Sequence, residues 1–145
     1  MNEFENLTGL AFLQKMIADG QASPMGTAMG MKLISVADGQ AIFEAHPTAH
    51  FYNPQARIHG GYTATLIDSA LGCAVQTKLG QGVGFGTIEL KVNYVGKITD
   101  QTSPLYCTAN VIHAGRTMLT AEAKLVDKAN KLYAHGSGTF LVYPK

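Results

Sequence analysis

One charged side chain stands alone in an apolar stretch near the middle of the sequence. Between positions 60 and 77, Asp68 is the only charged residue, and no Lys or Arg occupies positions 64, 65, 71 or 72, one helical turn away. A carboxylate is costly to bury unless it is paired, hydrogen-bonded or protonated. Asp68 is therefore a candidate general base or nucleophile. The alternative is an exposed Asp on a narrow polar stripe with Thr65 and Ser69.

A run of His59, Gly60 and Gly61 precedes this carboxylate. Glycine lets a substrate approach the backbone, and the free amides at a helix N-terminus favour a developing negative charge. An acyl-transfer reaction needs such a donor for its oxyanion. A Gly-Gly pair is also common in ordinary tight turns, so its significance depends on Asp68 two turns later.

The apolar residues around Asp68 recur at a spacing that predicts a helix from Gly61 to about Lys78. They lie nearly all round its cylinder, and a helix of that kind is expected to be enclosed by protein. The glycines at positions 80, 82, 84 and 86 end it. They precede a strand and lack the Lys-Ser/Thr ending of a phosphate loop, so we interpret them as a connection.

Alternating apolar and polar residues predict six strands elsewhere in the chain. These are Met31 to Val36, Gln40 to His46, Phe85 to Val95, Leu105 to His113, Thr117 to Asp127 and Lys131 to Tyr143. A first helix is expected from Leu7 to Asp19, then a loop containing Pro24, Gly26 and Gly30, and a second loop from Pro47 to Gly60. An antiparallel sheet and one long apolar helix are compact when the sheet curls around the helix. The pattern predicts an α+β fold with a central helix.

Composition narrows the class of protein. The 145 residues fit one domain, with 46% hydrophobic residues, 14% charged residues and a net charge of +1. No Lys/Arg run occurs, which argues against a nucleic-acid partner and against electrostatic docking to a membrane. Cys73 and Cys107 show no disulfide spacing, and no secretion signal or bilayer-length apolar run is seen. We expect a cytoplasmic protein.

The histidines do not predict a metal site. His46 and His50 are four residues apart, but Pro47 prevents a helical pair and no third ligand is evident. His113 and His135 are single strand residues. We expect neither a metal nor another cofactor.

Five short motifs are spaced along the chain: His50-Phe51-Tyr52-Asn53-Pro54, His59-Gly60-Gly61, Leu66-Ile67-Asp68-Ser69-Ala70, the run from Gly84 to Tyr94, and Gly138-Thr139-Phe140. Together they resemble the hotdog-fold acyl-CoA thioesterases of the phenylacetate-pathway type. The resemblance covers most of the chain from about Met29 onward. It implies a hotdog fold, in which a curved antiparallel sheet wraps around the central helix. Residues 1–145 would form one domain, with a variable helix and loop over residues 1–25.

The resemblance also implies roles for individual residues. Asp68 would activate the hydrolytic water or attack the thioester directly, and both alternatives stay open. The Gly60 amide would polarise the thioester carbonyl, helped by the Asn53 side chain. Thr87 would orient the water, and His59 would shape the site without acting as a base. The candidate substrate-binding residues are Arg116, toward the phosphates of CoA, and Gly61, Ser69, Tyr62 and Phe85, with Met118 as a further candidate for lining an acyl tunnel.

Helix geometry predicts that each active site is shared between two subunits. Gly60 and Asp68 are eight residues apart, so their backbones are separated by roughly 12 Å along a helix. Reacting atoms must lie about 3–3.5 Å apart. A two-fold dimer with two such helices antiparallel would bring Asp68 of one chain opposite Gly60 and Asn53 of the other. The resemblance implies the same homodimer, often paired into a tetramer.

The function predicted from these residues is hydrolysis of acyl-CoA to a free acid and CoA. Two alternatives remain open. A non-catalytic acyl-CoA-binding module could use the same fold, although Asp68, Asn53 and Thr87 would then have no evident purpose. A hotdog enoyl-CoA hydratase or dehydratase would use a His/Asp or His/Glu pair placed differently.

Overall fold

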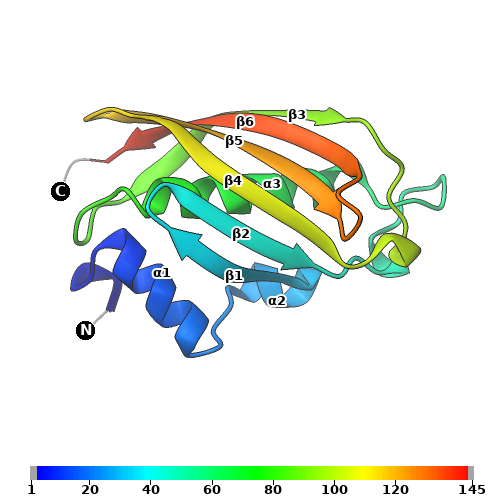
Figure 1. Cartoon of the computed structure of the whole chain (residues 1–145), viewed down its shortest axis with the longest axis horizontal. Helices are drawn as coiled ribbons and strands as arrows, with labels where there is room; N and C mark the ends of the chain where they lie inside the picture. Colours follow the sequence, from blue (N-terminus) through cyan, green and yellow to red (C-terminus); the bar gives the residue numbers. More distant parts are fainter. Residues whose placement is uncertain (1–2, 144–145) are drawn as a thin grey trace.

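A long helix, α3 (Gly60–Gln76), lies inside a curved antiparallel sheet in a computed structural model that describes residues 3–143 (Figure 1). Over this range the sheet has six strands, in the order β1-β2-β4-β5-β6-β3. The strands are β1 (Met31–Ala37), β2 (Gln40–Ala45), β3 (Phe85–Tyr94), β4 (Leu105–Ala114), β5 (Met118–Asp127) and β6 (Leu132–Val142). Every neighbouring pair is antiparallel. The predicted α+β hotdog architecture is confirmed.

The core lies between the concave face of the sheet and one side of α3. From α3, the side chains of Leu66, Ile67 and Leu71 are fully buried, and they share the core with Leu105 and Phe140 from the sheet. Full burial of a side chain of this size contributes about 1.5–3 kcal/mol. The wide apolar stripe of α3 is thus explained by the sheet that wraps around it.

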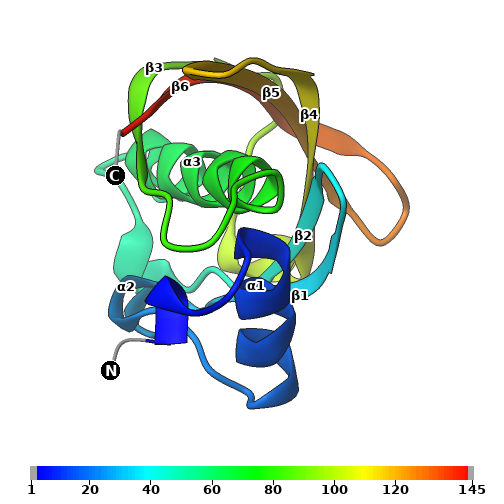
Figure 2. The same ribbon diagram turned by 90° about the vertical axis from the view of Figure 1, so that its left-hand side faces the viewer.

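The opposite side of α3 is less covered than the sequence predicts. Ala64, Thr65, Asp68, Ser69 and Gly72 are all half-buried. The sequence predicts that protein encloses α3 on all sides, because apolar residues surround this helix. Within one chain, only the side of α3 that faces the sheet is enclosed. In the view along α3, the sheet arches over the helix, and α1 and α2 lie beyond its open side (Figure 2).

Two short helices precede the sheet: α1 (Gly9–Ala18) and α2 (Pro24–Met29). The prediction of a plain loop at α2 was wrong. Ser23 caps α2 by accepting a hydrogen bond from the Gly26 amide, Pro24 opens it, and Gly30 ends it with a φ of 65°. This start and stop are those of a helix, but the single helical turn has no apolar periodicity to reveal it.

Three short 3-10 helices complete the elements: η1 (Glu3–Glu5), η2 (Ala49–Phe51) and η3 (Asp100–Thr102). The η2 turn lies in the predicted loop before α3. Among the described residues, none of the helices is long and apolar enough to cross a membrane.

Candidate active site

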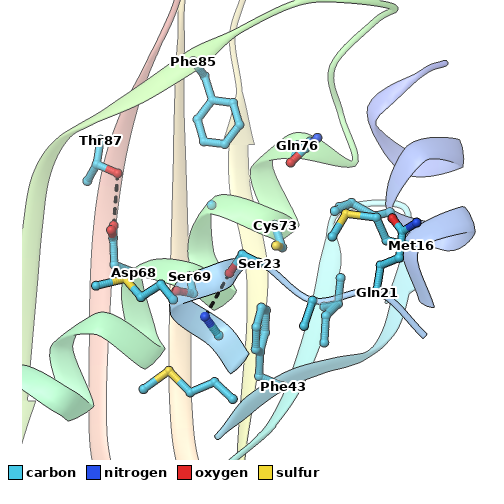
Figure 3. Close-up of a pocket in the computed structure, with 17 residues that line it drawn as sticks. Met16, Gln21, Ser23, Phe43, Asp68, Ser69, Cys73, Gln76, Phe85 and Thr87 are labelled. Atoms are coloured by element: carbon cyan, nitrogen blue, oxygen red, sulfur yellow. Dashed lines mark hydrogen bonds between the residues drawn. The ribbon is translucent and has the colours of Figure 1, made fainter. Parts of the chain in front are cut away.

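Asp68 and Thr87 meet at the open side of α3. Asp68 lies in the third turn of the helix, and Thr87 lies near the start of β3, an edge strand of the sheet. The Thr87 hydroxyl donates a hydrogen bond to Oδ1 of Asp68, with a distance of 3.0 Å (Figure 3). Asp68 is half-buried and carries a hydrogen bond, so it differs from the freely exposed Asp of the alternative interpretation. Both Thr65 and Ser69 nevertheless share its helix face.

A cavity of about 290 Å³ begins at this pair of residues. Asp68, Ser69, Gly72, Cys73 and Gln76 form one wall from α3, and Phe85 and Thr87 belong to a second wall from β3. Side chains of α1, the α1–α2 loop, α2, β1 and β2 close it: Leu13, Met16, Gln21, Ala22, Ser23, Met25, Gly26, Met31, Leu33 and Phe43. Asp68 is the only charged residue among them, so the cavity suits an apolar group placed next to a carboxylate.

Cys73 lines the same cavity but is not poised as a nucleophile. Burial raises the pKa of the Cys73 thiol to about 12. The thiolate is the reactive form of cysteine. At neutral pH the side chain is a thiol, and Asp68 is the better candidate for the chemistry.

The N-terminus of α3 is built around its first two glycines. His59 caps the helix, and its Nδ1 accepts a hydrogen bond of 2.8 Å from the Gly61 amide. The Tyr94 hydroxyl donates to the Gly60 carbonyl at 2.9 Å, and a Cβ on Gly60 would lie 3.3 Å from the Tyr94 ring. A side chain larger than glycine would be tight here and would need the Tyr94 ring to shift by a few tenths of an ångström. The Gly60 amide is the first of the helix and has no carbonyl one turn earlier to bond.

Asn53 and Gly60 line a second cavity of about 380 Å³, together with Arg57, Tyr94 and Lys97. The Asn53 Oδ1 accepts a hydrogen bond of 2.9 Å from the Gln55 amide. This bond identifies the oxygen of the side-chain amide and leaves its NH₂ group as a donor. Within residues 3–143, the Asn53 NH₂ has no hydrogen-bond partner.

The two sets of candidate residues therefore lie in different cavities of one chain. Asp68 and Thr87 line the first, and Gly60 and Asn53 line the second. Eight residues of helix separate Gly60 from Asp68, a rise of roughly 12 Å. A thioester carbonyl bound to the Gly60 amide would lie far beyond the reach of Asp68 in the same chain.

The other predicted site residues lie in different parts of the structure. Phe85 and Ser69 line the Asp68 cavity. Tyr62 is buried and donates a hydrogen bond to the Met29 carbonyl at 2.9 Å. Burial raises its pKa to about 12, so it stays neutral.

Four more of the predicted residues line neither cavity. Gly61 and His59 lie on a separate shallow hollow that also includes Tyr62. Arg116 is exposed in the turn between β4 and β5, and Met118 is 44% exposed at the start of β5. Neither Arg116 nor Met118 lines the cavity of Asp68 or that of Gly60.

Several lining residues were not recognised in the sequence. Tyr94 packs on Gly60, while Gly72 and Gln76 continue the Asp68 side of α3. The one available signal was spacing, because Gly72 and Gln76 follow Asp68 by one and two helical turns. Leu13 and Met16 reach the cavity from a helix far away in sequence, and no local pattern indicates that contact.

Comparisons with known proteins show the family of the chain. Residues 55–134 match the thioesterase superfamily, and the chain belongs to it. A 1,4-dihydroxy-2-naphthoyl-CoA hydrolase from Listeria monocytogenes is 28% identical over 119 residues, which are 81% of this chain and 94% of that protein. Human acyl-coenzyme A thioesterase 13 is 30% identical over 112 residues, covering 74% of this chain and 76% of the relative.

Solved structures show the same fold. The conserved protein PA5202 from Pseudomonas aeruginosa is 33% identical, has a TM-score of 0.78, and covers 84% of this chain and 95% of its own. The PaaI protein of the phenylacetic acid degradation operon of E. coli has a TM-score of 0.80, with 95% of this chain and 96% of that chain covered. At 22% identity, PaaI supports the fold alone. The predicted fold and family are confirmed, and with them the class of enzyme, a thioesterase.

Proposed function

We propose that the protein hydrolyses acyl-CoA thioesters, and that each active site combines Asp68 and Thr87 of one subunit with Gly60 and Asn53 of the partner subunit. The observation that carries the proposal is the division of these residues between two cavities of one chain. The relatives described above are named as a CoA hydrolase and a CoA thioesterase. A homodimer in the cytoplasm is the state in which we expect the enzyme to act, with tetramers as a further assembly.

The proposed chemistry follows from the hydrogen bonds. The thioester carbonyl would accept hydrogen bonds from the Gly60 amide and the Asn53 NH₂ of the partner subunit, both at the positive end of α3. Asp68 would take a proton from a water molecule that attacks the carbonyl carbon. The C–S bond then breaks, CoA leaves as the thiolate and is protonated, and the acid is released. Direct attack by Asp68, with an anhydride hydrolysed in a second step, is the alternative route.

Thr87 suits a positioning role in the general-base route. Its hydroxyl donates to Oδ1 of Asp68, which leaves the other carboxylate oxygen for water. The Thr87 oxygen keeps lone pairs that can accept a hydrogen bond from the same water. One threonine would thereby orient both the base and the nucleophile.

The surface next to Asp68 supports the dimer. β3 is an edge strand, and its Ile88, Leu90 and Tyr94 are 54%, 37% and 55% exposed. An exposed apolar edge strand is an aggregation hazard unless a partner covers it. The half-buried side of α3 lies beside this strand. A symmetric partner bound here would cover both surfaces and bring two α3 helices together.

The test is release of free thiol from a panel of acyl-CoA substrates, with the acid product measured in parallel. Equal amounts of thiol and acid are expected. A protein that binds acyl-CoA without releasing thiol would instead be a binding module. Hydration of an enoyl-CoA with the thioester intact would identify a hydratase.

A further inference from the structure

Gly72 occupies an interior helix position where, within one chain, an added Cβ would make only ordinary contacts. Glycine in the interior of a helix is less favourable than alanine because its backbone loses more freedom on folding. Gly72 has ordinary helical geometry, and an added Cβ would lie 3.6 Å from the Phe85 ring and 4.0 Å from the Phe140 ring. Those are normal van der Waals distances. By contrast, a Cβ at Gly9 would lie 1.8 Å from the Gln76 carbonyl oxygen, so glycine is required there.

The space in front of Gly72 belongs to the Asp68 cavity. The α3 residues that line it, Asp68, Ser69, Gly72, Cys73 and Gln76, follow one stripe of the helix. From Asp68 to Gln76 the helix rises roughly 12 Å. Figure 3 shows Asp68 and Thr87 at one end of the cavity, and Gln76, Met16 and Gln21 at the other. Gly72 lies midway between these ends.

The walls beyond Asp68 are mostly apolar, with the uncharged amides of Gln21 and Gln76 among them. Phe85 covers one side, and Leu33 and Phe43 of the sheet cover another. Met16 of α1 lies at the end opposite the carboxylate, and Leu13 of the same helix also lines the cavity. No charged side chain apart from Asp68 lines the cavity, so a charged acyl group would lose its hydration without compensation.

We infer that the acyl group of the substrate lies along α3 across Gly72, and that Gly72 and Met16 determine how long this group can be. The inference rests on the proposed thioesterase function and extends it to the substrate class. An extended chain advances roughly 1.2 Å per bond, as an extended backbone does. A cavity roughly 12 Å long along the helix therefore accepts an uncharged, apolar acyl group of about eight to ten carbons. An aromatic acyl group of similar length fits the same description.

The test compares kcat/KM for straight-chain acyl-CoA substrates from four to fourteen carbons, with phenylacetyl-CoA as the aromatic representative. For the unmodified protein, kcat/KM should rise to about eight to ten carbons and then fall. Gly72→Val places a branched side chain across the cavity. It should lower the ratio of kcat/KM for octanoyl-CoA to that for butyryl-CoA at least tenfold, and Gly72→Ala should lower the same ratio less.

Met16→Ala tests the far end of the cavity. Shortening this side chain should shift the optimum to acyl groups two or more carbons longer. Gln14→Ala is the matched control, because Gln14 is exposed on the same helix and lies outside the cavity. The optimum should stay unchanged in that variant.

The two proposals fail in distinguishable ways. If the unmodified protein releases no thiol from any acyl-CoA, the thioesterase proposal is wrong. If it does release thiol, but Gly72→Ala and Met16→Ala leave the dependence on chain length unchanged, the acyl group does not lie along α3. Each length profile is a ratio within one variant, so partial loss of folded protein does not affect the result.

Discussion

The hydroxyl of Thr87 lies 3.0 Å from Oδ1 of Asp68, a hydrogen bond that joins an edge strand to the open side of the central helix. The two residues are 19 positions apart in sequence and belong to different elements. Their contact places a carboxylate with a fixed orientation at the entrance to an apolar cavity.

Asp68→Asn is expected to retain the fold and lose most of the hydrolytic activity. The two side chains have nearly the same shape, but the amide cannot accept a proton from water or attack a thioester. Loss of a general base typically lowers the rate by about 10²–10⁴-fold. Thiol release gives kcat, and thermal unfolding checks the fold. Near-normal turnover in a folded variant would remove Asp68 from the mechanism.

Thr87→Ala should lower kcat less than Asp68→Asn, by about tenfold. It removes one hydrogen bond to a charged group, typically worth about 1.5–3 kcal/mol, of which water can replace a part. Thr87→Ser is the matched control, because it restores the hydroxyl and should recover most of the rate. A rise in KM with kcat unchanged would make Thr87 a substrate-binding residue.

Mixing inactive subunits tests whether the active site is shared. Asp68→Asn and Asn53→Ala subunits, each inactive alone, are combined under conditions that allow exchange. A mixed dimer then has one site with both defects and one site with neither. If half of the dimers are mixed, activity should recover to about a quarter of the unmodified level. The absence of recovery, with exchange demonstrated by differently tagged subunits, would place the whole site within one chain.

Gly72→Ala should stabilise the protein while it narrows the cavity. Alanine in a helix interior is more favourable than glycine by about 0.5–1 kcal/mol, and the added Cβ makes only normal contacts. Urea unfolding at a fixed protein concentration measures the change in the free energy of unfolding. Gly9→Ala is the opposite case, since its Cβ would collide with the Gln76 backbone and should destabilise the protein. A destabilised Gly72→Ala variant would mean that glycine is needed there for packing.

The thiols of Cys73 and Cys107 should react slowly with iodoacetamide in the native protein. Burial raises the pKa of each to about 12, whereas a free cysteine has a pKa of about 8.5. Because only the thiolate reacts, the rate at pH 8 should be at least about a hundredfold below that of glutathione, and it should keep rising with pH up to about 12. Rapid modification at neutral pH would show an activated cysteine.

Local sequence was sufficient for the six strands and the two longer helices. The period-two alternation of the strands and the apolar run around Asp68 are visible residue by residue, because hydrophobic periodicity depends only on which side of an element faces the core. The same apolar run identified Asp68 as an isolated carboxylate. The rise of a helix per residue then showed, without any tertiary information, that the backbones of Gly60 and Asp68 are too far apart to act on one carbonyl group within a chain. The helix α2 was missed, since a single turn between Ser23 and Gly30 has too few residues to show a period.

The contacts that complete the site depend on the tertiary structure. Thr87 reaches Asp68 because β3 pairs with β6 and follows the open side of α3, and strand order is not encoded in the alternation of a single strand. Met16 lines the cavity because α1 packs against β1 and α3, whereas Arg116, in the turn between β4 and β5, does not line it. The sequence by itself determined which residues could do the chemistry. Only the three-dimensional fold, through contacts between residues far apart in the chain, decided which of them meet.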